Sequence, residues 1–233
     1  GGVLFDITLE NEGCKIKITS TRNEELYSTI TSIVIKRKES DDSMWDTIKI
    51  IPISSEADLN YIFIDKFTRS RRTYDYSFVP MNGELEGDAV VKSIACDFDK
   101  MLIEDDSATY ELDLDLDVDF DINNSILFQE TLNSKYPFII NNGLSNYVSG
   151  TIEILPLPLD GNSRPTLAGS QKYKERFIEF LMNGNEKLLK LPRGQMWMVS
   201  INEKPKLLKS DFEGKEAVRF GFTETAAVPV LYS

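Results

Sequence analysis

Six carboxylates alternate with apolar residues in the middle of the chain. They are Glu111, Asp113, Asp115, Asp117, Asp119 and Asp121, called the acidic row below. A period of two predicts one long strand over 111–122, with the acidic row on one face. The buried face would consist of Leu112, Leu114, Leu116, Val118, Phe120 and Ile122. Carboxylates about 6.5 to 7 Å apart along one face repel one another, so folding stability alone does not explain the row.

Three interpretations of the acidic row remain open. The first is a solvated outer face of an antiparallel strand, which needs no further function. The second is calcium binding, but that requires carboxylates converging from a turn with a glycine, whereas these diverge along a straight strand. The third is an electronegative surface along which a polyanion passes without binding.

Residues that could carry catalysis are scarce. The chain has no histidine, which removes Ser-His-Asp and Cys-His pairs and most catalytic zinc sites. Walker, GxGxxG, GxSxG and HExxH motifs are absent. A glycosidase acid and base could come from paired carboxylates, but the acidic row points outward in parallel and has no aromatic sugar platform beside it. We therefore expect no catalytic residue, no metal site and no cofactor.

The charge of the chain is concentrated in one segment. Its 233 residues include 26 Lys and Arg against 38 Asp and Glu, a formal charge of −12. Eleven of the acidic residues and a single lysine lie between positions 97 and 121. This charge argues against binding to nucleic-acid phosphates or anionic lipid, and no apolar run approaches the roughly 18 residues of a membrane span. Cys14 and Cys96 are predicted to be buried, free thiols.

Residues 1–95 are predicted to form a β-sandwich domain. Short strands are expected at Cys14–Ile18, Ile33–Ile35, Ile48–Ile50, Tyr61–Asp65, Thr73–Pro80 and Ala89–Ala95. About seven strands at this spacing are typical of a sandwich. Trp45, like Trp197 in the second half, lies in an apolar strand context, so we expect both indole rings to pack in a core.

The segment from Asp65 to Val79 resembles the region between strands E and F of fibronectin type III domains. The resemblance rests on Asp65 after one strand and on the Tyr74-x-Tyr76 pattern in the next. It implies structural roles for both tyrosines, with Tyr74 as a tyrosine corner whose hydroxyl bonds to upstream backbone. A small basic patch also lies here, interpreted as either a solvated loop or a partner contact: Lys66, Arg69, Arg71 and Arg72.

Residues 96–233 are predicted to form a small β-barrel or split-barrel domain with one helix. The helix is expected over 170–182, with Ser170 as N-cap and an apolar face that includes Phe177. Strands are expected at 150–155 and 217–223, with a hairpin at 187–191 and 195–201 around Pro192-Arg193-Gly194 and a tail at 228–233. The fold class is therefore mostly β.

The second half resembles the distal-tail and baseplate-hub proteins of long-tailed phages and prophages. The segments that carry the resemblance are Tyr136–Phe138, Asn146–Thr151, Phe177–Gly184, Lys187–Lys190 and Gln195–Val199. The resemblance implies a non-enzymatic virion protein of the tail tip, assembled in the bacterial cytoplasm into a hexameric ring. Its partners would be further copies and the neighbouring tail-tube and tail-tip proteins, and the acidic row would line the channel for phage DNA.

A second function remains open. A monomeric carbohydrate-binding or adhesive β-sandwich module of a surface or secreted protein has the same composition. Such a module needs exposed aromatic residues in its loops, and the candidates are Tyr136, Phe138 and Tyr147. Ring assembly would favour the tail protein, and glycan binding would favour the module.

Overall fold

The computed structural model describes residues 4–23, 29–113, 118–123, 126–129, 138–141, 146–162, 164–209 and 215–232. The chain divides into two compact units. The first unit comprises Gly1–Met101, Lys190–Met196 and Val228–Ser233, and the second comprises Leu102–Leu189 and Trp197–Ala227. The sequence placed the domain boundary at 95/96, whereas the first compact segment continues to Met101 and two later segments join the first unit.

The fold class is confirmed. The chain is mostly β, its sheets pair antiparallel, and the described residues contain one α-helix. Within the described ranges, no helix has the length and apolar character needed to cross a lipid bilayer.

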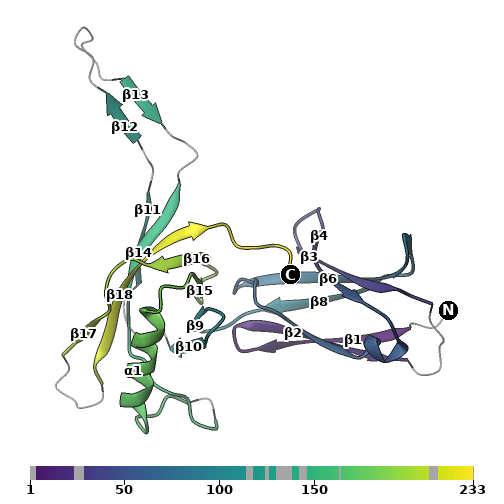
Figure 1. Cartoon of the computed structure of the whole chain (residues 1–233), viewed down its shortest axis with the longest axis horizontal. Helices are drawn as coiled ribbons and strands as arrows, with labels where there is room; N and C mark the ends of the chain where they lie inside the picture. Colours follow the sequence, from purple (N-terminus) through teal and green to yellow (C-terminus); the bar gives the residue numbers. More distant parts are fainter. Residues whose placement is uncertain are drawn as a thin grey trace. The chain divides into compact units, whose positions relative to one another are not determined.

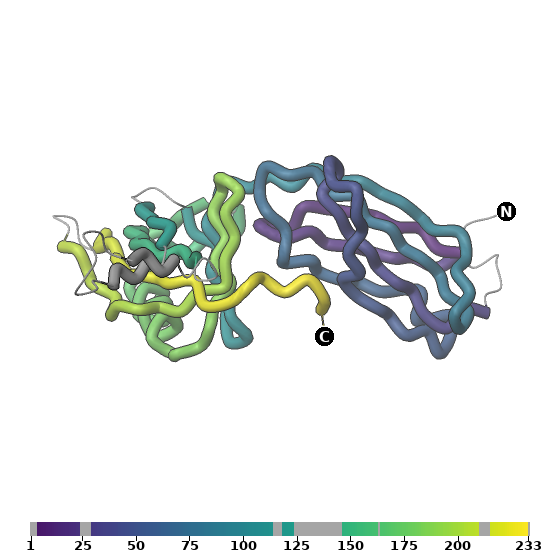
Figure 2. The backbone as a smooth tube through the Cα atoms, turned by 90° about the horizontal axis from the view of Figure 1, so that it is seen from above, coloured from purple at the N-terminus to yellow at the C-terminus, as the bar shows by residue number. Residues whose placement is uncertain are grey.

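The first unit is a sandwich of two antiparallel sheets (Figures 1 and 2). One sheet has the order β1-β2-β5, formed by β1 (Phe5–Glu12), β2 (Lys15–Arg22) and β5 (Tyr61–Asp65). The other has the order β4-β3-β6-β7, with β8 along β6, formed by β3 (Ser32–Glu39), β4 (Asp46–Pro52), β6 (Arg72–Asn82), β7 (Leu85–Glu86) and β8 (Val90–Cys96). A short 3-10 helix, η1 (Glu56–Leu59), precedes β5.

Alternate residues of both sheets fill the core of the first unit. Ile16 and Ile18 of β2 face Ile33 and Ile35 of β3, and all four side chains are fully buried. Burial of one such side chain stabilises the fold by about 1.5 to 3 kcal/mol. Strand β1 is not among the strands predicted from the sequence, although its first residues follow the same alternation.

The structure places five residues of the first unit about which the sequence made predictions. The prediction that Trp45 packs in the core is wrong: it follows a polar turn, is 37% exposed, and has Lys38 Nζ 5.4 Å from its ring centre. Tyr74 is buried and its hydroxyl accepts a hydrogen bond from the Arg69 amide at 2.7 Å, the geometry expected of a tyrosine corner. Tyr76 is fully buried. Cys14 and Cys96 are buried thiols that form no disulfide, as predicted.

An eight-stranded sheet dominates the second unit. Its order is β10-β9-β15-β16-β18-β14-β11, and β17 pairs with β18. The strands are β9 (Lys100–Glu104), β10 (Thr109–Asp113), β11 (Val118–Asn123), β14 (Tyr147–Ile154), β15 (Lys187–Lys190), β16 (Met196–Ile201), β17 (Lys206–Leu208) and β18 (Ala217–Ala226). Two further strands, β12 (Ile126–Gln129) and β13 (Phe138–Asn141), pair with each other. The predicted hairpin is confirmed as β15 and β16, and the predicted closing strand as β18.

The connection between β10 and β11 requires this sheet to curl. The two strands stand at opposite ends of the sheet order, yet only residues 114–117 separate them. A flat sheet would place them about 29 Å apart, at about 4.8 Å per strand step. Five residue steps of extended chain span at most about 18 Å. The sheet is therefore curved toward closure, as expected of a barrel or split barrel.

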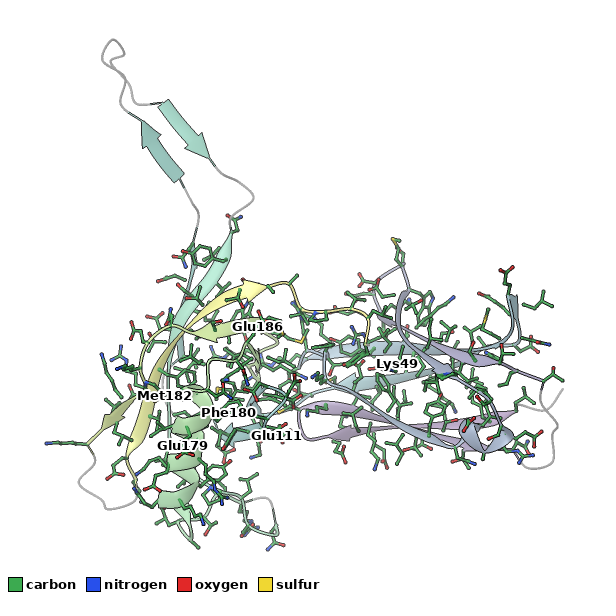
Figure 3. The ribbon with its side chains drawn as sticks, viewed as in Figure 1. Lys49, Glu111, Glu179, Phe180, Met182 and Glu186 are labelled. Carbon is green, nitrogen blue, oxygen red and sulfur yellow. The ribbon has the colours of Figure 1, made fainter. Side chains whose placement is uncertain are left out.

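The helix α1 (Ser170–Leu181) covers part of one face of this sheet (Figure 1). Its Phe177 ring lies 6.1 Å from that of Phe220 in β18 and 5.0 Å from that of Tyr110 in β10. Phe180, labelled in Figure 3, also packs against Tyr110 at 4.9 Å. The predicted cap is shifted by one residue, because Gly169 occupies the N-cap with a φ of 72° and Ser170 is the first helical residue.

Candidate functional surface: the acidic row

The structure places four of the six carboxylates of the acidic row. Glu111 and Asp113 lie on β10, and Asp119 and Asp121 lie on β11. Asp115 and Asp117 lie outside the described residues. Because β10 pairs with β9 and β11 pairs with β14, the two described pairs belong to opposite ends of the sheet order.

The expected alternation of burial holds in β10 and fails in β11. Leu112 is 1% exposed between two half-buried carboxylates. In β11 the two aspartates are exposed as predicted, but Phe120 is 37% exposed and Ile122 is 71% exposed. The prediction that these two side chains lie on a buried face is therefore wrong. The physical reason is that β11 stands at the end of the described strand order and pairs with β14 on one side, so fewer neighbouring side chains cover its faces.

The apolar face of β11 continues the buried face of the sheet. Val118 stands opposite Ile152, which stands opposite Phe220 under helix α1, and both inner side chains are buried. The next row contains Phe120, Gly150 and Phe222. This face thus remains apolar from the buried core out to Phe120 and Ile122, where its side chains become exposed.

Trp197 belongs to the same aromatic cluster. Its ring stacks on Phe222 at 5.8 Å and meets Phe120 edge-on at 5.3 Å. Trp197 therefore packs against apolar neighbours as predicted, but its side chain is half-buried and not fully buried. Gly150 makes this arrangement possible, because a Cβ there would lie 2.3 Å from the Asp119 carbonyl oxygen and 2.8 Å from the Phe120 Cβ. Only glycine lets β11 approach β14 so closely.

The opposite face of β11 is polar and acidic. Asp119 stands opposite Thr151, and Asp121 stands opposite Ser149. A shallow cleft of about 210 Å³ lies here, and its polar lining consists of Asp119, Asp121, Ser149, Thr151, Asn202 and Glu203. Three carboxylates and no basic side chain line it, so the cleft attracts cations and repels anions.

The segment after β16 adds two residues to the cleft that the sequence did not predict there. Asn202 donates a hydrogen bond from Nδ2 to the Thr223 hydroxyl at 2.6 Å, and Glu203 adds the third carboxylate to the cleft. No periodicity marks these two residues, because they follow the strand and reach the cleft only through the pairing of β16 with β18.

Two acids of the charged segment are structural. Glu104 is buried and accepts a hydrogen bond from Thr109 at 2.7 Å. Asp105 accepts hydrogen bonds from Lys187 Nζ at 2.8 Å and from Asn183 Nδ2 at 2.7 Å. Burial would raise the pKa of Asp105, but its hydrogen bonds from Lys187, Ser107 and Asn183 hold that pKa well below its usual range. These two carboxylates stabilise the second unit and do not belong to an acidic surface.

Metal binding can be assessed for the described part of the chain. Across the ranges that the structure describes, no group of three or more Cys, Asp or Glu side chains has the geometry to hold a metal ion. Beside the carboxylates of Asp119, Asp121 and Glu203, the cleft lining offers the hydroxyls of Ser149 and Thr151 and the side-chain amide of Asn202.

Comparisons with known proteins give no family. No protein-family model and no curated protein matches the chain. A chain from the solved "Virion of native gene transfer agent (GTA) particle" is 14% identical, covering 55% of this chain and 92% of that chain, with a TM-score of 0.33. A chain from "Titin kinase and its flanking domains" is 9% identical, covering 93% of this chain and 36% of that chain, with a TM-score of 0.29. At these scores neither likeness supports an argument about function.

Proposed function

We propose that this protein is a structural component of a phage virion, which forms part of a ring at the tail tip and acts through assembly. The observation that carries the proposal is the two-sided edge strand β11. One of its faces is apolar and exposed at Phe120 and Ile122, and the other is acidic at Asp119 and Asp121. Such a strand suits a subunit whose apolar face contacts a neighbouring copy and whose acidic face lines a passage for anionic DNA.

The apolar face supports the assembly part of the proposal. An exposed isoleucine and phenylalanine on an edge strand are costly for an isolated subunit, because edge strands with apolar faces favour association. The open edge and the apolar face would both be covered by a second copy in a closed ring, most simply a hexamer. Fibronectin-like and tail-hub-like halves, as the sequence resemblance implies, suit a virion protein.

The acidic face supports the channel part of the proposal. Three carboxylates without a basic neighbour in the cleft lining repel DNA phosphates at short range. If this face lines the bore of the ring, DNA slides along it without binding. The gene transfer agent particle is also a virion, but its similarity to this chain is low, so the proposal rests on the geometry of β11.

The experiment that tests the assembly compares two exposed isoleucines. We expect the wild-type chain to self-associate in sedimentation velocity runs and to form rings in negative stain. Ile122→Asp should abolish association, because it places a charge on the proposed contact. Ile50→Asp is the matched control, since Ile50 of β4 in the first unit is 53% exposed and outside that contact. A wild-type monomer at every concentration, or equal loss in both variants, contradicts the proposal.

One observation favours the second function, a monomeric carbohydrate-binding module. Trp45 is exposed, and the neighbouring charged residues Lys38, Asp42 and Asp46 line a polar pocket of about 360 Å³. An exposed indole beside carboxylates suits stacking on a sugar ring. Glycan-array binding that is lost in Trp45→Ala, together with a monomeric mass, would favour this function over the tail protein.

A further inference from the structure

The first unit contains a buried carboxylate whose hydrogen-bonding capacity is filled. Asp65 is 0% exposed. Its two oxygens accept hydrogen bonds from Arg37 Nη1 at 2.8 and 2.7 Å, from the Tyr76 hydroxyl at 2.7 Å and from the Tyr232 hydroxyl at 2.7 Å. A buried carboxylate is costly without such partners, so each donor matters. We call this group the Asp65 site.

Tyr232 enters this site from the far end of the chain. Its hydroxyl donates to Asp65 and accepts hydrogen bonds from the amides of Lys66 at 2.6 Å and Phe67 at 3.0 Å. One donor and two acceptor positions are thus all used. The ring meets Phe63 edge-on at 5.0 Å and lies against Phe67 at 4.7 Å. The site therefore selects a phenol, because it recognises both the aromatic ring and the hydroxyl.

The rest of the segment Val228–Tyr232 is held loosely by comparison. Val230 is 46% exposed and Leu231 is 58% exposed. Pro229 has no N–H to donate, and this segment belongs to no strand of either sheet. The Tyr232 amide donates one backbone hydrogen bond, to the Ile48 carbonyl at 2.8 Å. A half-buried aromatic anchor on a largely exposed segment is the pattern of a bound peptide and not of a core strand.

We propose that the Asp65 site is a peptide-binding site, and that it accepts the segment 228–232 of a second copy as well as that of its own chain. In a dilute solution the chain's own segment occupies the site, because its effective concentration is high. In an assembly the segments of neighbouring copies are concentrated around one another, and exchange would link subunits. This inference is independent of the contact proposed for β11.

The test uses the full chain with a protease site inserted between Ala226 and Ala227. After cleavage, an excess of a fluorescent peptide of residues 227–233 should replace the original segment. Fluorescence anisotropy measures the binding of the labelled peptide, and mass spectrometry identifies which peptide the protein retains. A cleaved chain that refuses the labelled peptide, or that unfolds on cleavage, would overturn the proposal, because the segment would then be an integral part of the fold.

Two variant peptides give the specificity. The Tyr232→Phe peptide should bind at least about tenfold more weakly, since it lacks the hydroxyl that donates to Asp65 and accepts from the Lys66 amide. The Leu231→Ala peptide is the matched control and should bind as the wild-type peptide does, because that side chain is mostly exposed. Equal affinity of the phenylalanine peptide would overturn the proposed phenol recognition. The Ile122→Asp variant should exchange peptide normally, which separates this test from that of the ring.

Discussion

Carboxylates in the two units have opposite surroundings. Asp65 in the first unit is enclosed by an arginine, two tyrosines and a backbone amide. Asp119 and Asp121 in the second unit are exposed beside a third carboxylate, in a cleft that no basic side chain lines. The comparison teaches that acid content alone does not define an acidic surface. Only carboxylates that are not surrounded by hydrogen-bond donors of the folded chain are available to interact with other molecules.

The largest effect is expected at the Asp65 site. Asp65→Ala leaves the buried Arg37 guanidinium without its partner, so the free energy of unfolding should fall by about 3 to 5 kcal/mol. Urea unfolding measures this loss. Asp121→Ala is the matched control and should change stability by at most about 0.5 kcal/mol. If both variants lose similar stability, the two regions do not differ as described.

The next effect concerns a buried lysine of the first unit. Lys190 Nζ donates hydrogen bonds to the carbonyls of Cys14 and Lys66 and lies 4.9 Å from the Phe98 ring centre. Burial lowers the pKa of Lys190 to about 8. The unfolded chain therefore binds a proton between pH 8 and about 10.4 that the folded chain lacks, so stability should rise across this range.

The rise should amount to at most about 3 kcal/mol. Above pH 10 a loss follows, because burial raises the pKa of Tyr74 to about 12 and the folded state keeps a proton that the unfolded state releases. Thermal unfolding from pH 7 to 10 measures the rise, and Lys190→Met should remove it. An identical pH profile in the variant would show that another group is responsible.

A smaller rise of stability with pH, in the acidic range, is expected in the second unit. The pKa of Asp105 is depressed in the folded state, so its contribution to stability is present above pH 4 and is lost as the pH falls further. The loss should be roughly 2 kcal/mol, as for other salt-bridged carboxylates. Unfolding curves between pH 5 and 2 test this, with Asp105→Asn as the variant that should lack the acid-dependent step. If the acid-dependent loss of stability persists in Asp105→Asn, another group is responsible for it.

The smallest effect on stability is expected at the acidic face of β11. Exchange of Asp119 and Asp121 for lysine should change the free energy of unfolding by at most about 0.5 kcal/mol, because both side chains are exposed. The same variant should gain affinity for double-stranded DNA at low salt, measured by anisotropy. Lysines at the exposed Asp41 and Asp42 of the first unit form the control with equal charge. Equal DNA affinity of both variants would contradict a special role for β11.

Much of the local structure could be predicted from the sequence. The alternation of apolar residues predicted β3, β5, β6 and the hairpin of β15 and β16, and apolar residues at helical spacing predicted α1 within one residue of its ends. The aromatic pattern of the segment 65–79 placed Tyr74 and Tyr76 in the core. These features follow from short-range rules, since side-chain direction in a strand or helix depends on a few neighbouring residues.

The tertiary structure determines which face of each strand is buried by other elements. The period of two correctly placed Phe120 and Asp121 on opposite faces of β11, but whether Phe120 is buried depends on which elements lie above it. The Asp65 site combines residues 37, 65, 76 and 232, and no local pattern joins them. Alternation along a strand is a property of the backbone, whereas burial and charge pairing depend on contacts between segments far apart in the chain.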